Sequence, residues 1–324
     1  MQIKVISGST VRRLVTLADL AGPMRDALVG FSAGTVYQHP RVTAEPSDGD
    51  YVLIMPAGGG GKVGLKVLTM FAASTQHGLP SVQGLVVLVD GTTGQPLALV
   101  DGTVITELRT AAVSALATER LARADARTLA VIGAGVQATA HLEALQGVRE
   151  WDDVRVHSRT PERGQQLVKQ AEAWGLPVRW APSAAEAADG ADVICTATSS
   201  CSPVIPSDAV GPGTHITAVG AFGATCRELP TEVVVRATLF ADSHASVLAE
   251  AGDVLIPIGE GRLPADPPLT EIGRVLAGDH PGRTDDDEVT VFKSLGLPVE
   301  DVAACTLVYD RALAAGAGQD VDFD

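Results

Sequence analysis

A glycine-rich turn places backbone amides where a phosphate could bind. The apolar run 128–132 leads into Gly133-Ala134-Gly135-Val136-Gln137-Ala138, and a helical pattern follows. Gly133 permits the tight turn, Gly135 lets a pyrophosphate approach the backbone, and a small residue such as Ala138 allows close packing of helix on strand. The helix N-terminus adds unpaired N–H groups and the positive end of its dipole. This strand–turn–helix pattern predicts a dinucleotide-binding site.

The residues after the second strand indicate which dinucleotide binds. The run 154–157 ends in Ser158-Arg159-Thr160, with Arg163 one turn later. Proteins that bind NAD usually have Asp or Glu here for the ribose 2′-hydroxyl, whereas hydroxyls and a guanidinium suit the 2′-phosphate of NADPH. The acids Asp152 and Asp153 stand before the strand, at its other end. We therefore expect NADPH rather than NADH, with an incidental surface arginine as the alternative.

Three basic residues in the N-terminal third are candidates for binding an anionic substrate. Arg109 lies near the start of a long helix, where a cation opposes the helix dipole unless an anion binds beside it. Its alternative is a surface position, paired with Glu107 or Glu119. Lys66 interrupts an apolar strand, although edge strands often contain lysine. Arg41, in the run QHPRV, is equally ambiguous, so the residue types alone leave all three open.

The N-terminal segment is expected to form a sheet. Residues 17–31 have the pattern of a helix. Four strand-like runs follow, separated by Gly-rich turns: 51–57, 62–68, 84–90 and 96–102. Four strands before any alternation with helices predict a mixed, largely antiparallel sheet. Gly58–Gly61 is expected to be an irregular hairpin loop.

A second type of architecture follows a long helix, roughly 103–124, for which Thr106 is the expected N-cap. Short β-branched runs then alternate with helices or loops: 128–133, 153–158, 177–181, 192–198 and 215–220. This alternation predicts an α/β fold with a doubly wound parallel Rossmann sheet. A last apolar helix within 289–316 is expected to return to the first domain. We expect domains at 1–120, with 300–324 returning, and at 121–299.

Composition argues against several kinds of partner. With 46% hydrophobic residues and a formal net charge of −15, the chain lacks the dense positive charge that nucleic acids or anionic membranes attract. No apolar run is long enough to cross a bilayer, and the start MQIKVISGST has no signal-peptide pattern. The cysteines at 195, 201, 226 and 305 form no CxxC pair, so we expect neither a metal site nor a disulfide. A cytoplasmic protein fits these features.

A series of motifs resembles those of the ornithine cyclodeaminase/mu-crystallin family. In chain order they are LIMPA, GLKVLT, DGTTGQPLALVDGTVITELRTAAVSALAT, VIGAGVQA, HSRTPERG, AVGA with the later REL, LAEAGDV and VTVFKSLGLPVEDVAA. They extend over about residues 38 to 310, and RTAA, GAGVQA and VFKSLG are specific in combination. The resemblance implies a Rossmann domain that binds NADP and an N-terminal α+β domain for substrate binding and dimerisation, completed by the C-terminal helix. It also implies a homodimer that acts on small amino, imino or keto acids.

The resemblance also implies roles for individual residues. Arg41, Lys66 and Arg109 would bind the substrate carboxylate, with Met55 and Phe222 as further substrate-binding residues. The predicted cofactor-binding residues are Thr110, Gly133, Gly135, Val136, Gln137, Ser158, Arg159, Thr160, Arg163, Val219, Lys293 and Ser294.

Two positions depart from the cyclodeaminase branch of the family. The resemblance implies a glutamate two residues before Met55-Pro56 in that branch, where this chain has Leu53. It also implies an aspartate two residues after Gly220, shared with the alanine dehydrogenase branch, where this chain has Phe222. An apolar side chain cannot compensate a buried ammonium, whose desolvation costs several kcal/mol. The resemblance therefore points to ketimine reductase and Δ1-pyrroline-2-carboxylate reductase, and disfavours ornithine cyclodeaminase.

The expected reaction is reduction of Δ1-pyrroline-2-carboxylate or Δ1-piperideine-2-carboxylate by NADPH to the L-cyclic amino acid. Lys66 is the candidate proton donor to nitrogen, because no other titratable side chain is assigned to that position. The alternatives are an ornithine cyclodeaminase-like enzyme, an alanine or N-alkyl amino acid dehydrogenase, or an NADPH-regulated binding protein of the mu-crystallin type.

Overall fold

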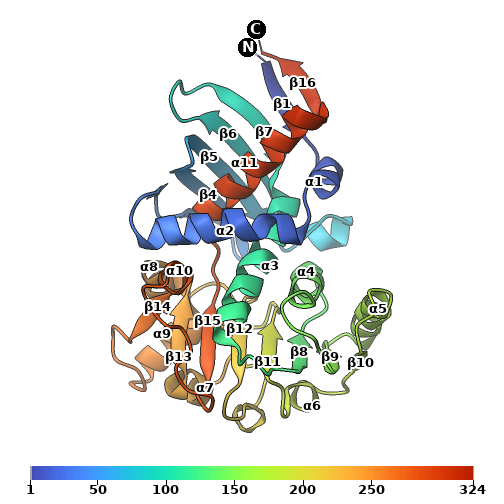
Figure 1. Cartoon of the computed structure of the whole chain (residues 1–324), viewed down its shortest axis with the longest axis vertical. Coiled ribbons are helices and arrows are strands. Elements are labelled where there is room, and N and C mark those ends of the chain that lie inside the picture. The colour runs from blue at the N-terminus through green and yellow to red at the C-terminus, as the bar shows by residue number, and fades with distance from the viewer. Residues whose placement is uncertain (1, 324) are drawn as a thin grey trace. The chain divides into compact units, whose positions relative to one another are not determined.

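The computed structural model of the chain describes residues 2–323 and divides into two compact units (Figure 1). Residues up to Arg109 and from Gly296 onward form unit 1, and Thr110–Leu295 form unit 2. The first division falls within helix α3 (Gly102–Leu121), so this helix begins in unit 1 and ends in unit 2. Unit 1 is therefore discontinuous in the sequence.

Unit 1 contains a mixed sheet with the strand order β16-β1-β7-β6-β5-β4-β2, and β3 pairs with β4. Only β1 and β7 pair in parallel among these strands, in the described part of the chain, and the other pairs are antiparallel. The strands are β1 (Gln2–Ile6), β2 (Tyr37–Gln38), β3 (Val42–Ser47), β4 (Asp50–Gly59), β5 (Lys62–Met70), β6 (Val82–Asp90), β7 (Pro96–Asp101) and β16 (Gln319–Asp322). The predicted mixed, largely antiparallel sheet is confirmed.

Helices cover one face of this sheet. The helical elements of unit 1 are α1 (Gly8–Leu14), α2 (Leu17–Ser32), η1 (Ser74–His77) and α11 (Pro298–Ala315). Helix α11 packs on β4, β5, β6 and α2, as its red ribbon in Figure 1 shows. Side chains alternate between faces along a strand, so Leu53, Met55 and Ala57 of β4 are buried while Ile54 is exposed. Helix α11 thus covers one face of the unit 1 sheet. This is the inner face, and the opposite face, which contains Ile54, is the outer face.

Unit 2 contains a parallel sheet with the strand order β10-β9-β8-β11-β12-β15-β13-β14. Its strands are β8 (Thr128–Ile132), β9 (Asp153–His157), β10 (Val178–Trp180), β11 (Val193–Thr196), β12 (His215–Ala218), β13 (Thr238–Ala241), β14 (Leu269–Glu271) and β15 (Thr290–Lys293). Its helical elements are α4 (Val136–Leu145), α5 (Pro161–Glu172), α6 (Ala184–Ala188), η2 (Ser207–Ala209), α7 (Thr231–Arg236), α8 (His244–Glu250), α9 (Gly252–Gly259) and α10 (Ile272–Ala277). The predicted doubly wound α/β fold is confirmed.

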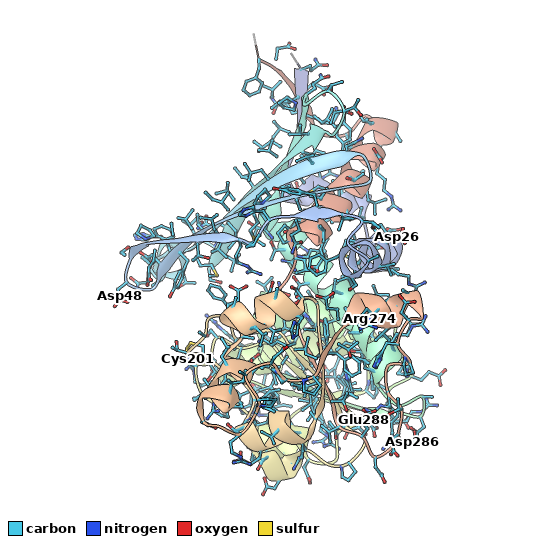
Figure 2. All side chains as sticks on the ribbon, turned by 90° about the vertical axis from the view of Figure 1, so that its left-hand side faces the viewer. Asp26, Asp48, Cys201, Arg274, Asp286 and Glu288 are labelled. Carbon is cyan, nitrogen blue, oxygen red and sulfur yellow. A yellow bond between two sulfur atoms is a disulfide. The ribbon has the colours of Figure 1, made fainter. Side chains whose placement is uncertain are left out.

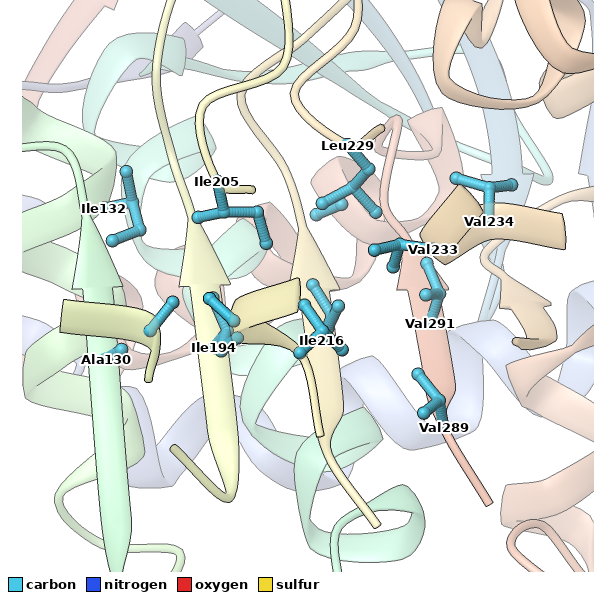
Figure 3. Close-up of a cluster of buried hydrophobic side chains, with 14 of the residues drawn as sticks. Ala130, Ile132, Ile194, Ile205, Ile216, Leu229, Val233, Val234, Val289 and Val291 are labelled. Atoms are coloured by element: carbon cyan, nitrogen blue, oxygen red, sulfur yellow. The ribbon is translucent and has the colours of Figure 1, made fainter. Parts of the chain in front are cut away.

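Buried β-branched side chains hold the parallel strands of unit 2 in place. Figure 3 shows Ile132, Ile194, Ile216 and Val291 on one face of four neighbouring strands. Each of these residues is at most 3% exposed. A sheet buried on both faces requires such continuous apolar runs, which is why they stand out in the sequence.

Two local predictions are wrong. Helix α3 begins at Gly102, because the Asp101 carboxylate accepts a hydrogen bond from Val104 N at 2.9 Å. Thr106 therefore lies inside the helix, where its hydroxyl donates to Gly102 O, and Arg109 lies beyond the first turn. Gly58 and Gly59 belong to strand β4, since both pair with β5, and the loop is restricted to Gly60 and Gly61.

The expectation of no disulfide is also wrong. Cys201 and Cys226 form a disulfide across a sequence separation of 25 residues, and Figure 2 labels Cys201. Cys201 follows β11 and Cys226 follows β12, which are adjacent and parallel, so their loops leave the same edge of the sheet. Long-range pairing of this kind leaves no spacing pattern in the sequence.

Within residues 2–323, no helix has the length and apolarity needed to span a membrane. The same residues contain no cluster of His, Cys, Asp and Glu side chains suited to a metal ion.

Candidate active site

A buried ion cluster lies in unit 1. Lys66, which is 1% exposed, donates from Nζ to Asp301 Oδ1 at 2.9 Å. Arg109 donates from Nε to the same oxygen at 3.2 Å and from Nη1 to Glu300 Oε2 at 2.7 Å. Buried charges are tolerated when they are paired in this way, and one carboxylate oxygen here serves two cations.

Three elements bring these side chains together. Lys66 lies in the middle of β5, opposite Met55 of β4 and Val86 of β6, with its side chain on the face that α11 covers. Glu300 and Asp301 lie in the first turn of α11, which begins at Pro298, a residue preorganised for that position. The positive end of the α11 dipole stabilises both carboxylates. The cluster thus joins a strand, the start of α3 and the start of α11.

Arg41 lies beside this cluster. Its Nη2 donates to the carbonyl oxygen of Gly296 at 2.9 Å. Gly296 has φ +79°, and a Cβ atom there would lie 2.2 Å from Arg109 Nη1, so glycine is required at this position. Arg41, Lys66 and Arg109 thus bring three basic side chains close to the start of α11.

Burial changes the acidity of the cluster. Desolvation lowers the pKa of Lys66 to about 8, with Arg109 acting in the same direction and Asp301 opposing both. Lys66 is therefore mostly protonated at neutral pH, yet it can lose its proton without strong base. Burial raises the pKa of the Cys305 thiol well above its ordinary value, so this neighbour on α11 stays neutral. A lysine with a pKa near the working pH suits proton transfer.

The structure brings four of the five predicted substrate-binding residues together within unit 1: Arg41, Met55, Lys66 and Arg109. The inner face beside them is apolar. Leu53 and Met55 are each 3% exposed, and Leu53 stands where the cyclodeaminase branch is expected to have its glutamate. The fifth predicted residue, Phe222, lies in unit 2, in the loop after β12.

The predicted dinucleotide turn has the geometry that a phosphate requires. Gly133 has φ +128°, and a Cβ atom there would lie 2.5 Å from Ala197 O, so glycine is required. Gly135 is the N-cap of α4, where no side chain caps the helix and a Cβ would meet nothing within 4 Å. Val136 in the first turn is 59% exposed. The amides of Val136 and Gln137 therefore lie in an open helix N-terminus that fits a pyrophosphate.

The residues after β9 include two exposed arginines, Arg159 and Arg163, with one acid, Glu162, between them. The Ser158 hydroxyl bonds to the backbone of Thr160, which is the N-cap of α5 and has no side-chain cap bond. Arg159 and Arg163 are exposed, and neither forms an ion pair with a described residue. Asp153, at the other end of the strand, forms ion pairs with Arg155 and Arg179. The guanidinium groups of Arg159 and Arg163 can therefore bind a phosphate.

The remaining predicted cofactor residues lie in or near the core of unit 2. Ser294, at 2%, and Thr110, at 6% exposed, are buried, and Val219 is half-buried after β12. Lys293 donates to Ala221 O at 2.7 Å and pairs with Asp253 Oδ2 at 2.8 Å. Its charge is thus already compensated within unit 2, and it holds the loop after β12 in place.

Three buried carboxylates are not predicted from the sequence: Glu300 and Asp301 in unit 1, and Glu228 in unit 2. Glu300 and Asp301 follow a proline at a helix start, where acids commonly serve the helix dipole, so their type gave no sign of a buried role. Glu228 is fully buried in unit 2 and accepts hydrogen bonds from Thr198 N, Gly220 N and Ala221 N. Burial raises the pKa of Glu228 above its ordinary value. Its role depends on contacts with residues elsewhere in the sequence, which leave no local pattern.

Comparison with known proteins identifies the family of this chain. A profile of the ornithine cyclodeaminase/mu-crystallin family matches residues 2–316. A Δ1-pyrroline-2-carboxylate reductase of Bacillus cereus is 36% identical over 98% of this chain and 99% of its own length. The ketimine reductase mu-crystallin of Rattus norvegicus is 38% identical over 90% of this chain and 91% of its own.

A solved structure matches over nearly the whole length. It is the Δ1-pyrroline-2-carboxylate reductase of Thermococcus litoralis in complex with NADH and L-proline. It is 33% identical with a TM-score of 0.95, covering 98% of this chain and 100% of its own. These matches extend through both units, and the predicted family is confirmed. This chain belongs to the ornithine cyclodeaminase/mu-crystallin family.

Proposed function

We propose that this chain is an oxidoreductase that reduces the C=N bond of a small cyclic imino acid to the L-cyclic amino acid, using NADPH. The observation that supports this best is the buried cluster of Lys66, Arg109, Glu300 and Asp301, with Arg41 beside it. Guanidinium and ammonium groups gathered in this way suit a carboxylate ligand. The names of the Bacillus, Rattus and Thermococcus relatives point to the same class of reaction.

The substrate carboxylate binds to Arg41, Lys66 and Arg109 in this proposal. Guanidinium groups bind carboxylates through two parallel hydrogen bonds, which orient the ligand as well as attract it. The fixed carboxylates Glu300 and Asp301 hold Arg109 in position before the substrate arrives. Little reorganisation is then needed on binding, which favours catalysis by orientation.

The absence of an acid at position 53 selects the substrate. Leu53 is buried beside Met55 and cannot compensate the distal ammonium of a diamino acid. Phe222 likewise offers no carboxylate to deprotonate an amine before cyclisation. Leu53 instead suits a preformed apolar ring whose nitrogen is already in the cycle. We therefore favour a cyclic imine over ornithine.

Proton transfer falls to Lys66. Its ammonium donates one proton to the imine nitrogen, and solvent returns that proton to the lysine later. A nicotinamide cofactor, when bound, would supply the hydride for C2, and the C=N π electrons would remain on nitrogen, which takes the proton of Lys66. The balanced reaction consumes the imino acid, NADPH and one proton, and yields the cyclic amino acid and NADP⁺.

Unit 2 binds the cofactor in this proposal. The open N-terminus of α4 accepts the pyrophosphate through Gly135, Val136 and Gln137. Arg159 and Arg163 bind the 2′-phosphate, which is the basis for preferring NADPH. Thr110, Val219, Lys293 and Ser294 complete the predicted cofactor set, Lys293 by fixing the loop after β12.

The enzyme is a homodimer in this proposal, with the outer face of the unit 1 sheet as its interface. Val42, Ile54, Val67 and Leu85 are register partners across β3, β4, β5 and β6, and all four are 37% to 51% exposed. Alternation places them opposite the face that α11 covers. A continuous exposed apolar row of this kind marks an interaction surface.

The proposed function is tested by NADPH oxidation with Δ1-pyrroline-2-carboxylate and Δ1-piperideine-2-carboxylate. The wild-type chain is expected to turn over at least one of them. Arg41→Ala is expected to raise KM by about 10- to 100-fold, because it removes one charged hydrogen-bond donor to the carboxylate. This variant keeps the pairs of Glu300 and Asp301 with Lys66 and Arg109. Arg12→Ala, which removes an exposed ion pair with Glu107 in the same unit, is the matched control.

Other outcomes of this assay overturn the proposal in distinct ways. NADPH oxidation that needs pyruvate and ammonia or methylamine would assign an open-chain amino acid dehydrogenase. Release of ammonia from ornithine would assign a cyclodeaminase. Tight NADPH binding without turnover of any of these substrates would assign a binding protein.

A further inference from the structure

Asp301 stands between the two cations that the proposed function uses. Its Oδ1 accepts from Lys66 Nζ at 2.9 Å and from Arg109 Nε at 3.2 Å. The Asp301 side chain is 1% exposed, so water does not screen either interaction. Glu300, the neighbouring acid, bonds to Arg109 at 2.7 Å. The two acids of this turn thus have different sets of partners, although they are adjacent in sequence.

Lys66 has apolar neighbours on its own sheet and polar neighbours on helices α3 and α11. Its strand neighbours on β4 and β6 are Met55 and Val86, which are apolar. From α11 it faces Asp301 and the thiol of Cys305, and from α3 it faces Arg109. Asp301 is therefore the carboxylate that opposes both the desolvation of Lys66 and its repulsion by Arg109.

We propose that Asp301 is a positioning residue that fixes Lys66 beside Arg109 and keeps it protonated for transfer to the imine nitrogen. This inference rests on the proposed function and extends it to a residue that acts through Lys66. Lys66 Nζ gives its proton to the imine nitrogen and becomes a neutral amine. The hydrogen bond from this amine to Asp301 is weaker than the one from the ammonium. That change in bond strength favours the return of a proton from solvent to Lys66.

The second oxygen of Asp301 is consistent with this role. Oδ2 is buried and accepts no hydrogen bond from the residues between 2 and 323. A buried carboxylate oxygen without a protein donor leaves an acceptor for a water molecule. Such a water would also supply the route by which Lys66 regains its proton.

The sequence provides a direct way to observe Lys66. The chain contains five lysines, at positions 4, 62, 66, 169 and 293. After labelling with ¹³C,¹⁵N-lysine, NMR should therefore give a spectrum simple enough to assign Lys66 from its loss in Lys66→Met. Burial lowers the pKa of Lys66 to about 8, so its signal is expected to titrate separately from those of exposed lysines.

The test compares Asp301→Asn with Glu300→Gln. Asp301→Asn removes the charge that favours the ammonium, so the Lys66 titration midpoint is expected to fall by about 1 to 3 pH units. The basic limb of the kcat/KM profile is expected to move down with it. Glu300→Gln is the matched control, since it removes an adjacent carboxylate that bonds to Arg109. It is expected to raise KM and to move the Lys66 midpoint less.

The two readouts separate this inference from the proposed function. If the wild-type chain reduces no imino acid, the proposed function fails, and the NMR titration still decides the role of Asp301. An unchanged Lys66 midpoint in a folded Asp301→Asn chain overturns the inference, as does an equal shift in Glu300→Gln. If Asp301→Asn does not fold, Asp301→Glu takes its place: it keeps the charge, and a Lys66 midpoint far from that of the wild type would overturn the inference.

Discussion

Lys66 and Arg159 show two ways in which this fold uses a basic residue. Lys66 is enclosed in unit 1, where desolvation has lowered its pKa to about 8 and prepared it to release a proton. Arg159 is exposed in unit 2, with no described acid as a partner, and keeps its charge for a ligand. A buried lysine suits proton transfer, and an exposed arginine suits phosphate binding.

Removing the exposed arginines is expected to change cofactor preference. Arg159→Ala and Arg163→Ala should each lower kcat/KM for NADPH by about 10- to 100-fold, the effect of one charged hydrogen bond to phosphate. The values for NADH should change little, because NADH has no 2′-phosphate. Steady-state kinetics with both cofactors measure this. Arg179→Ala, which removes an exposed arginine paired with Asp153, is the control and should affect neither cofactor.

At the residue scale, the sequence identifies the candidate basic residues but not the carboxylates that pair with them. Lys66, Arg109 and Arg41 are recognisable as candidates, yet each has an alternative as an ordinary surface residue. The burial of the first two depends on Asp301, which lies 235 residues after Lys66 and 192 after Arg109. Contacts of that range have no local signature. The resemblance to a family identified the cations, and the structure added their counter-ions.

At the scale of elements, the loops after β11 and β12 are linked by a disulfide and by hydrogen bonds to a buried carboxylate. The disulfide Cys201–Cys226 links them covalently. Glu228 links them by hydrogen bonds, since it accepts from Thr198 N after β11 and from Gly220 N after β12, each at 2.7 Å. Asp253 accepts from the Glu228 amide at 2.8 Å and extends the network to Lys293. Loops that leave the carboxyl edge of a parallel sheet are where its ligands bind.

Glu228→Gln is expected to destabilise unit 2. The new amide group would place an N–H against backbone N–H groups that now donate to a carboxylate, leaving buried donors unpaired. The expected loss in the free energy of unfolding is about 2 to 4 kcal/mol. Urea unfolding of the variant measures it. Glu232→Gln, at an exposed position on α7, is the control and should leave the unfolding midpoint unchanged.

The elements themselves are largely predictable, because periodicity reports burial directly. Helix α2, strands β4 to β12 and helix α4 follow from apolar spacing, as the predicted ranges around them show. The predicted N-terminus of α3 is misplaced because Asp101 caps it, whereas Thr106 has a similar preference for caps. Strands β1, β2, β3, β13, β14, β15 and β16 lie outside the predicted strand ranges. Length alone does not explain this, because β13, β14 and β15 are no shorter than β10, β11 and β12.

At the scale of the whole molecule, the exposed row on the unit 1 sheet bears on assembly. Val67→Glu places a charge in the middle of that row, and Leu85→Glu places one at its β6 end. Both are expected to convert a dimer into a monomer, because burying an unpaired carboxylate costs several kcal/mol. Sedimentation equilibrium of the wild-type chain and the variants measures the change.

Leu313→Glu is the control for this prediction. Leu313 is 53% exposed, about as much as Leu85, but it lies on α11 rather than on the outer face of the sheet. Its substitution should leave the dimer intact. A wild-type chain that is monomeric at micromolar concentration would remove the proposed interface.

The discontinuity of unit 1 has a consequence for the order of biosynthesis. Lys66 is synthesised 235 residues before Asp301, its counter-ion on α11, and β1 must wait longer still for β16. All of unit 2 is translated in between. A nascent chain that has reached Leu295 therefore contains Lys66 and Arg109 without the carboxylates that make their burial tolerable. Co-translational folding is expected to complete unit 2 first, and the first-made strands to reach their final packing when the last helix leaves the ribosome.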